Sequence, residues 1–444
     1  MALTATRPGT NGSTLSANTL AIGLAGGILA LVVAATYAGH LRAVVETTLW
    51  AAPVVGLVAF VSGLLVRDRS ARGFVFQILV FALVAGGLAY LIHNTIINLE
   101  SRKIATGYAF LDREARFEIG ESLIPYSAAS PYGRALLVGF LNTLKVSVLG
   151  IVIATVLGIL VGILSLSKNW LVAKLAAVYV NFLRNVPILL HIILWYTAVT
   201  YLLPPIREAF VPAAGFFLTQ RGLYLPVPID APGWHWALWA VPVGAILAWA
   251  FARWAKARQD STGQAMPVVS IGAAIVIGLP VLVWLLAGAP SEMSVPELKG
   301  FNFQGGYNIS PEFMSVLGGL SIYTSAYIAE ITRAGIMAVA HGQTEAGRSL
   351  GLSEGVIMRK VILPQALRVI IPPTTNQYLN LTKNSSLSVA VGYPDLVGVG
   401  NTTLNQTGQA IEVIVIFMAV YLTTSLVTSF LMNSYNRRIQ LVER

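Results

Sequence analysis

Long apolar runs constrain this chain more than any other feature of its sequence. A helix that crosses a lipid bilayer needs about 20 consecutive, mostly apolar residues. Runs of this kind recur along the chain at 20–39, 47–66, 74–99, 136–166, 171–203, 234–251, 268–288, 313–340, 361–391 and 411–432. The run at 171–203 is expected to contain a break, and the polar-rich run at 361–391 to be irregular. The pattern predicts an all-α integral membrane protein with about ten spans.

Composition supports the membrane assignment. Hydrophobic residues make up 56% of the chain and charged residues only 11%, against about 25% charged in ordinary soluble domains. The formal net charge of +10 comes from short basic clusters between the runs, which indicate membrane orientation rather than a nucleic-acid partner. Cysteine is absent, which excludes disulfides, thiolate metal sites and cysteine nucleophiles. The five histidines are too scattered to predict a metal site.

The basic clusters also predict the orientation of the chain. They comprise Arg67, Arg69 and Arg72; Lys168 and Lys174; Arg253, Lys256 and Arg258; Arg348, Arg359 and Lys360; and Arg437 and Arg438. Alternating spans place all of them on one face if both termini are cytoplasmic. The loop 100–134 is an exception, because it lies outside and is basic, but long loops weigh weakly in orientation. The N-terminus lacks the pattern of a cleaved signal peptide, so the first span is expected to direct insertion.

The chain divides into five predicted parts. Residues 1–19 form a polar cytoplasmic N-terminus, and 20–131 a transmembrane extension with an outer loop. Two core blocks, 132–208 and 311–444, flank a two-span insert at 209–310. No internal repeat is evident, which counts against the inverted-repeat architecture of many secondary transporters.

The most informative polar segment is the predicted cytoplasmic loop 341–364. Thr344 is expected to cap a short helix there, with Glu345 in its first turn. Ala346 and Gly347 would give that helix a small face, and Gly351 would end it. A short helix with a small and apolar face is suited to a groove on another protein, and the alternative is a helix lying on the bilayer surface.

The spacing in this loop resembles a family signature. Glu345-Ala346-Gly347, three residues, Gly351, nine residues and Val361-Ile362-Leu363-Pro364 are similar to the coupling loop of ATP-binding-cassette (ABC) importer permeases. In that family the loop docks on a separate ATPase. Gly347 departs from the second alanine of the signature, which costs about 1 kcal/mol of helix propensity and leaves docking intact. The residues that the resemblance assigns to coupling are Glu345, Ala346, Gly347, Leu350, Gly351, Leu352, Leu363 and Pro364.

Further segments resemble the polar amino-acid branch of these permeases, which includes the histidine, glutamine and glutamate types. They are Asn142-Thr143-Leu144, Arg184-Asn185-Val186-Pro187, Ala329–Gly335, Pro364–Arg368 and Lys383–Leu387. The N-terminal extension, the insert and the C-terminal ending are similar to broad-specificity L-amino-acid permeases of Gram-negative bacteria. The resemblance implies a type I ABC importer-like core of about five spans with three extra N-terminal helices and a two-helix insert.

The resemblance also implies an activity and partners. The chain is expected to be the permease subunit of an amino-acid importer in the bacterial inner membrane, surrounded by lipid. Its expected partners are an ABC ATPase dimer, a second permease subunit that is related but different, and a periplasmic amino-acid-binding protein. The alternative is that two copies of this chain form the permease pair. The chain has no Gly-Lys pair and hence no phosphate-binding loop, so it is not expected to be an enzyme. ATP and Mg²⁺ are expected in the ATPase, with no cofactor in this chain and no nucleic acid.

Polar side chains within membrane runs are the candidates for the substrate path. They are Asn376, Gln377, Asn380, Lys383, Asn384, Ser385, Ser386 and Glu330. Such groups are unfavourable at membrane depth unless they are paired or line a wet cavity, so hydrogen bonding between helices is the alternative. Glu330 is expected to pair with Arg333 rather than with a substrate ammonium. Lys145 is expected to extend its side chain toward the membrane surface.

The rival interpretation is a secondary transporter driven by an ion gradient. Such a transporter needs acidic side chains within the membrane to couple the ion. Only Glu330 and Glu412 come near this requirement, and both lie toward the ends of their spans. The coupling-loop pattern would also have no role in it.

Overall fold

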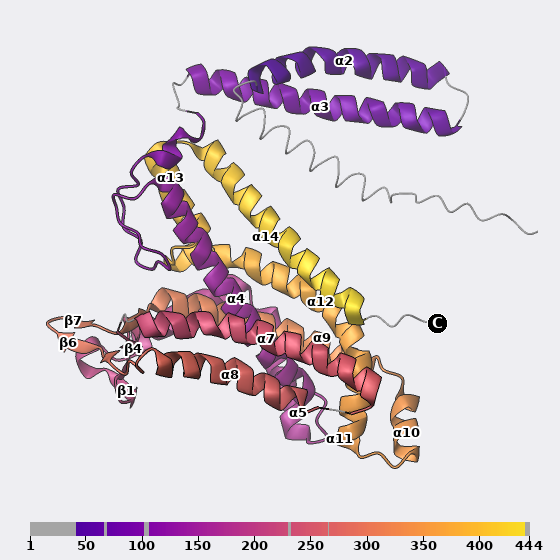
Figure 1. The fold of residues 1–444 in the computed structure, drawn as a ribbon. Helices are drawn as coiled ribbons and strands as arrows, with labels where there is room; N and C mark the ends of the chain where they lie inside the picture. The colour runs from indigo at the N-terminus through magenta and orange to yellow at the C-terminus, as the bar shows by residue number, and fades with distance from the viewer. Residues whose placement is uncertain (1–40, 66–68, 102–105, 230–231, 265, 440–444) are drawn as a thin grey trace, which may run out of the picture. The chain divides into compact units, whose positions relative to one another are not determined.

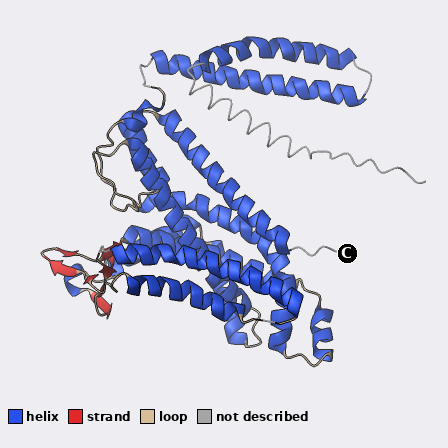
Figure 2. Ribbon diagram, in the orientation of Figure 1, coloured by secondary structure: helices blue, strands red, loops and turns tan. Residues whose placement is uncertain are grey.

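The structure is a computed structural model that describes residues 41–65, 69–101, 106–229, 232–264 and 266–439. Helices make up most of these residues, which confirms the predicted fold class (Figures 1 and 2). The predicted span at 20–39 lies outside the described residues. Contacts divide the chain into two compact units. One comprises Met1–Phe117, Ala128–Ala135 and Gly400–Ala419, and the other Glu118–Ser127, Leu136–Val399 and Val420–Arg444.

The first unit contains a helical hairpin of α2 (Leu41–Leu65) and α3 (Arg69–Ser101). Small side chains form much of its seam, because Ala52 and Ala82 are buried while most of the large apolar residues are exposed. A Cβ on Gly86 would lie 3.0 Å from that of Ala52, so the two backbones approach closely. The unit also includes the 3₁₀ turn η1 (Tyr108–Asp112), whose neighbour Gly107 donates its backbone N–H to Glu412 at 2.7 Å.

The core of the second unit surrounds α9 (Pro311–Met337). About half of the residues of this helix are buried, and it packs against α5 (Trp170–Asn185), α6 (Ile188–Thr197) and α12 (Leu363–Asn384). Most of α4 (Tyr132–Leu164) also packs there. Remaining elements are the 3₁₀ turn η5 (Ser385–Val391), α13 (Leu396–Thr407) and α14 (Ala410–Ile439), of which the two helices extend into the first unit.

Two glycines on α4 allow the close approach of α9. A Cβ on Gly158 would lie 2.6 Å from the Cβ of Ile328, and one on Gly162 would lie 2.7 Å from the carbonyl oxygen of Ala329. Neither contact tolerates a side chain without a shift of the helices. The two glycines form a small-xxx-small pair, a pattern that allows two helix backbones to approach closely.

The run at 171–203 is broken, as predicted. Helices α5 and α6 meet at an angle of 104°, and α6 continues into the π-helical turn η2 (Ala198–Leu202). Pro187 precedes the first residue of α6, and Val186 before it is extended, with φ −100° and ψ 131°. A proline disfavours the helical conformation of the preceding residue and lacks an N–H, so the helix ends and restarts in a new direction.

The insert contains the second helical hairpin, formed by α7 (Pro232–Thr262) and α8 (Val268–Leu286). Short strands lie at its base, which the all-α prediction does not include. They are β1 (Phe210–Ala213), β2 (Phe216–Thr219), β3 (Gly222–Leu225), β4 (Val227–Pro228), β5 (Met293–Ser294), β6 (Glu297–Lys299), β7 (Asn302–Gln304) and β8 (Tyr307–Ile309). They form an antiparallel sheet of order β1-β2-β3-β8 and two strand pairs, β4-β5 and β6-β7. The 3₁₀ turn η3 (Ile206–Glu208) leads into β1, and Ile206 packs with Tyr224 and Phe303.

Among the described residues, six single helices are long and apolar enough to cross a membrane, and the bent α5–α6 pair is a further candidate. The six are Arg42–Ser62, Val75–Ser101, Tyr132–Leu164, Gly233–Thr262, Val268–Leu286 and Ala410–Asn436. The predicted runs at 313–340 and 361–391 form α9 and α12, which are not in this set. Both carry polar side chains at intervals, and α9 is the helix that the others surround.

Candidate translocation path and coupling loop

The coupling loop folds as a compact element between α9 and α12. It comprises α10 (His341–Ser349), α11 (Glu354–Ile357) and the π-helical turn η4 (Met358–Ile362). The predicted cap at Thr344 is wrong, because α10 already begins at His341 and Ala340 occupies the cap position. His341 and Glu345 lie one turn apart, with Nδ1 and Oε1 at 3.0 Å, so the first turn is closed by a side-chain pair instead.

Gly351 ends α10, as predicted. Its φ is +71°, a left-handed conformation that a glycine adopts without strain. The N–H of Gly351 donates to the carbonyl of Arg348 at 2.9 Å, and the N–H of Leu352 donates to that of Gly347 at 3.1 Å. This pair of bonds is a Schellman motif, which satisfies the last carbonyls of a helix and reverses the chain direction.

The small residues of α10 face in different directions. Gly347 is the buried residue of the helix, and a Cβ there would lie 2.9 Å from Cγ1 of Ile357. The face of α10 that contains Gly347 therefore packs against Ile357 of α11. Glu345 and Ala346 are exposed, Leu350 is 77% exposed and Leu352 is 38% exposed. The loop thus presents apolar side chains outward at the end of α10.

Polar contacts tie the coupling loop to α12. The Gln365 amide Nε2 donates to the carbonyl of Val361 at 3.0 Å and lies 3.4 Å from Oε1 of Gln343 in α10. Leu363 is half-buried and Pro364 is exposed at the start of α12. Arg348 donates from Nε to Oε1 of Glu354 at 2.7 Å, and this bond lowers the pKa of the Glu354 carboxyl. Gln365 thus links the start of α12 to α10.

The predicted path residues of α12 occupy different environments. Asn376, Asn380 and Lys383 are exposed, and their spacing of four and three residues places them on one face of the helix. We call these three residues the polar stripe. Gln377 and Asn384 are half-buried beside it.

The two serines that follow do not extend the stripe. Ser385 is 1% exposed, and its hydroxyl donates to the carbonyl of Thr382 at 2.8 Å. Ser386 is half-buried and donates to the carbonyl of Lys383 at 2.8 Å. Both hydroxyls are used by the local backbone, which is what the 3₁₀ turn η5 requires after the helix ends.

Glu330 lies apart from the polar stripe, in a cavity of about 530 Å³ between α4, α5 and α9. Its lining consists of Ser165, Trp170, Ala173, Lys174, Ala177, Val180, Asn181, Arg184, Ala329, Glu330 and Arg333. Glu330 Oε1 accepts from Arg333 Nη2 at 2.6 Å, so the expected ion pair is present. Arg184 lies over the ring of Tyr327 at 5.2 Å, and both it and Lys174 are exposed. The cavity therefore has more basic than acidic side chains.

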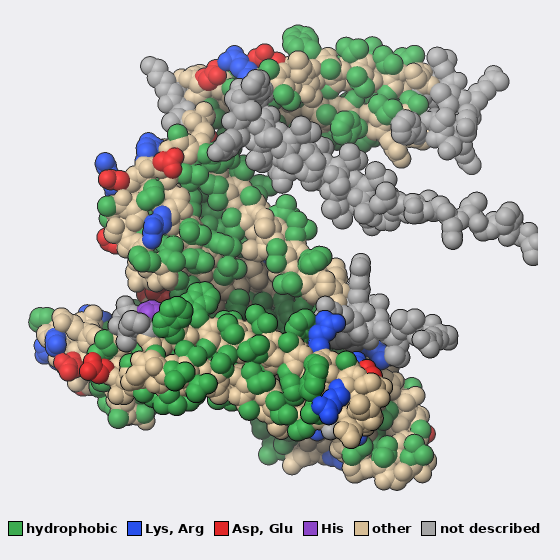
Figure 3. Space-filling view, viewed as in Figure 1, with side chains coloured by type: hydrophobic (Ala, Val, Ile, Leu, Met, Phe, Trp, Pro, Cys, Tyr) green, Lys and Arg blue, Asp and Glu red, His purple; other side chains and the backbone are tan. Residues whose placement is uncertain are grey.

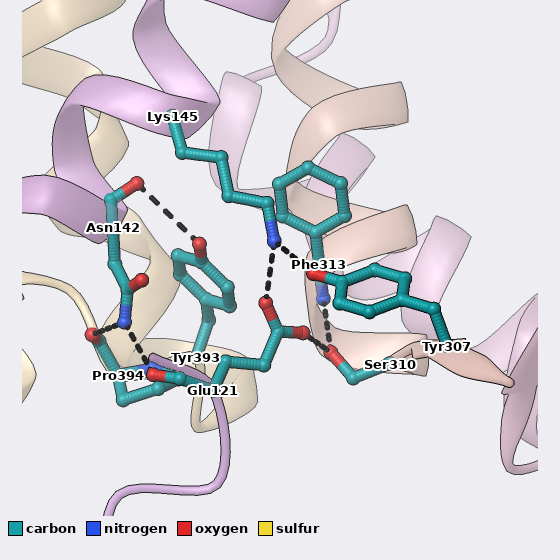
Figure 4. A network of polar contacts seen from close by, with 8 residues as sticks. All are labelled: Glu121, Asn142, Lys145, Tyr307, Ser310, Phe313, Tyr393 and Pro394. Carbon is teal, nitrogen blue, oxygen red and sulfur yellow. Dashed lines mark hydrogen bonds and ion pairs between the residues drawn. The ribbon is translucent and has the colours of Figure 1, made fainter. Parts of the chain in front are cut away.

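A buried network surrounds Lys145 of α4, and Figure 4 shows its members pointing toward one another. Lys145 Nζ lies 3.0 Å from Oε2 of Glu121, donates to the Tyr307 hydroxyl at 3.1 Å, and sits 4.1 Å from the ring centre of Phe313. The other oxygen of Glu121 accepts from the hydroxyl of Ser310, the cap of α9. The Lys145 side chain is only 15% exposed and is paired with Glu121, a partner that the sequence did not predict.

Asn142 extends the same network one turn earlier on α4. It is fully buried, and its Nδ2 donates to the carbonyls of Glu121 and Pro394, each at 2.9 Å. The loop segment around Glu121 is thus joined by hydrogen bonds to α4, β8 and the start of α9. Within the described residues, no group of three or more His, Cys, Asp or Glu side chains could hold a metal ion.

Known proteins match the chain over most of its length. Residues 240–441 match the family described as binding-protein-dependent transport system inner membrane component. A protein of Escherichia coli (strain K12), provisionally named the amino-acid ABC transporter permease protein YhdX, is 51% identical over 85% of this chain and 96% of its own length.

Two further relatives have amino-acid transport in their names. The general L-amino acid transport system permease protein AapQ of Rhizobium johnstonii is 48% identical over 85% of this chain and 94% of its own length. The glutamate/glutamine/aspartate/asparagine transport system permease protein BztB of Rhodobacter capsulatus is 41% identical over 86% of this chain and 96% of its own. With this identity over nearly the full length of its relatives, the chain belongs to the family of amino-acid ABC transporter permeases.

Proposed function

We propose that this chain lines the path of an amino-acid importer in a bacterial inner membrane, with both termini in the cytoplasm. Membership of the ABC permease family implies a separate ATPase, which binds ATP and Mg²⁺ and drives the cycle. The amino-acid substrates named for two relatives, general L-amino acids and the group of glutamate, glutamine, aspartate and asparagine, support the substrate class. The finer partners we propose are an ATPase dimer, a second related permease and a periplasmic amino-acid-binding protein.

The observation that carries the proposal is the polar stripe on α12. Asn376, Asn380 and Lys383 are exposed on one face of a helix whose other side is packed into the core. Amide and ammonium groups facing lipid hydrocarbon would be strongly unfavourable, so this face borders water or another subunit. The amides of Asn376 and Asn380 can donate and accept hydrogen bonds, so they suit either end of an amino acid. The ammonium of Lys383 suits its carboxylate. The polar stripe therefore lines the path where two permease subunits meet.

The cavity around Glu330 serves the inner end of the same path. It lies beside the last turns of α9, directly before the coupling loop. Arg333 already neutralises Glu330, while Arg184 and Lys174 keep their charge toward the cavity. A carboxylate is the group that such a cavity attracts. We assign it to transient contact with the substrate carboxylate before release.

The coupling loop connects this path to the ATPase. Leu350, the exposed residue that follows α10, is suited to a groove on the ATPase, with Glu345 and Ala346 of α10 beside it. Contacts from Gln365 then pass a movement of α10 to α12, which carries the polar stripe. Closure of the ATPase dimer would in this way reorient the path.

Uptake by a path-lining variant tests the proposal. Asn376→Leu combined with Asn380→Leu should lower the uptake of labelled glutamate or glutamine by about tenfold or more, because two hydrogen-bonding groups are lost. Membrane abundance and the amount of co-purified ATPase should stay unchanged. Thr428→Val is the matched control, since its hydroxyl bonds the carbonyl of Thr424 in its own helix. Normal uptake by the double variant would contradict the assignment of the polar stripe to the path.

A further inference from the structure

The α7–α8 hairpin has a register that locates the membrane boundary. A Cβ on Gly244 of α7 would lie 3.2 Å from the carbonyl of Ile275, and one on Gly272 of α8 would lie 3.8 Å from Cβ of Ala248. A Cβ on Gly233 would lie 3.1 Å from Cβ of Ala287. In this register, a residue of α7 lies opposite the residue of α8 for which the two residue numbers add up to about 520. Val268, the first residue of α8, therefore lies opposite residue 252 of α7.

The length of α8 then fixes the depth of the hairpin. Its 19 residues span about 28 Å at about 1.5 Å per residue, close to the thickness of the hydrocarbon core. None of its residues is buried within the chain, so lipid or another subunit covers the side of α8 that faces away from α7. Because α7 continues to Thr262, its residues 253–262 project by about 15 Å beyond the start of α8, into the headgroup region.

Basic and aromatic side chains gather at this boundary. They are Trp249, Arg253, Trp254, Lys256 and Arg258, which we call the basic–aromatic cluster. The guanidinium of Arg253 lies 5.0 Å from the ring centre of Trp249, and that of Arg258 lies 5.5 Å from Trp254. Both tryptophans are at least half exposed. Figure 3 shows apolar side chains along the hairpin and basic ones near the C-terminal end of α7.

The charges of the cluster have no acidic partners within the described part of the chain. Arg253, Lys256 and Arg258 are all exposed and make no ion pair there, and the nearby acid of the helix is Asp260 alone. Tryptophan favours the membrane–water interface, where its ring contacts apolar lipid and its N–H can donate a hydrogen bond to water. Cations just outside such a belt meet the phosphates of lipid headgroups.

We propose that the basic–aromatic cluster binds the headgroup of an anionic membrane phospholipid and thereby anchors the insert at one face of the bilayer. The arginines supply forked donors for phosphate oxygens, and the tryptophans hold the guanidinium planes in place. Lys256 adds a third positive charge. This site lies outside the substrate path and the coupling loop, so it stands independently of the proposed transport function.

Lipid binding by the full chain tests the proposal. The chain, purified with its accompanying subunits, is placed in nanodiscs of phosphatidylcholine with increasing fractions of phosphatidylglycerol. Native mass spectrometry measures the phosphatidylglycerol retained per chain, and thermal unfolding measures the midpoint. The variant R253Q/K256Q/R258Q is compared with the control R116Q/R207Q/K299Q, which removes the same charge from exposed side chains outside the hairpin.

The wild-type chain and the control should retain phosphatidylglycerol in preference to phosphatidylcholine and should unfold at higher temperature as its fraction rises. The cluster variant should lose about fivefold in affinity per removed cation, and with it the shift in midpoint. An equal response of both triple variants would overturn the proposal, as would a wild type without preference for phosphatidylglycerol. A cluster variant that keeps the lipid but loses the co-purified ATPase would show a protein-binding surface instead.

Discussion

At the scale of single residues, close contacts in the core depend on the absence of side chains at a few glycines. Gly335 of α9 is the clearest case, because a Cβ there would lie 2.3 Å from Cγ1 of Ile370 on α12. Gly158 and Gly162 do the same between α4 and α9. The helix that leads into the coupling loop is thus held on both sides by contacts that an added methyl group would disrupt.

Gly335→Ala should therefore destabilise the chain. Overpacking of a core typically costs about 1–3 kcal/mol, more than the about 1 kcal/mol that alanine gains in helix propensity. Gly342→Ala in α10 is the control, since nothing lies within 4 Å of its Cβ position. Thermal unfolding in detergent should give a lower midpoint for the first variant and an unchanged or higher one for the second. The same midpoint for both would show that α9 and α12 are less tightly packed than described.

The Glu121–Lys145 pair also acts at this scale, and its energy depends on burial. The two side chains are 11% and 15% exposed, so removing one partner leaves a largely buried charge without its counter-ion. Lys145→Leu or Glu121→Leu alone should cost about 3–5 kcal/mol. The double variant should recover a large part of that loss, because no unpaired charge remains. Thermal unfolding of the four proteins measures the coupling, and additive losses would contradict a buried pair.

At the scale of elements, the end of α10 and the break between α5 and α6 could be predicted because their determinants are local. Gly351 ends α10 through its own backbone conformation, and Pro187 breaks the α5–α6 run in the same way. Neither requires knowledge of distant residues. By contrast, the direction in which Gly347 faces depends on Ile357, and the partner of Lys145 lies in the loop before α4. Those contacts belong to the folded chain and leave no signal in the local pattern.

Gly351→Val should uncouple transport. A β-branched residue is strained at a φ of +71°, so the end of α10 would rearrange and carry the exposed Leu350 with it. Gly355→Val is the control, because its backbone is helical and nothing lies within 4 Å of its Cβ position. Uptake and co-purified ATPase should both fall in the first variant and persist in the second. Full uptake by Gly351→Val at normal abundance would contradict a coupling role for this loop.

At the scale of the whole molecule, the order of helical segments followed from hydropathy, whereas the strands of the insert did not. Each strand has two to four residues, and Tyr224 pairs with Asn308 across the entire α7–α8 hairpin. Such non-local pairing of short segments has no periodic signature. The sequence indicated Asn376, Asn380, Lys383 and Ser385 together as polar residues in one apolar run. Only the positions of these residues around the folded helix show that the first three are exposed and that Ser385 is buried.

ATP-driven uptake tests the central claim most directly. The complex containing this chain is reconstituted in liposomes with its binding protein, and the entry of labelled glutamate or glutamine is measured with ATP on the ATPase side. Uptake should require ATP, should stop when a non-hydrolysable analogue replaces it, and should be insensitive to the removal of proton and sodium gradients. Uptake that follows an imposed ion gradient without ATP would contradict the account and favour a secondary transporter.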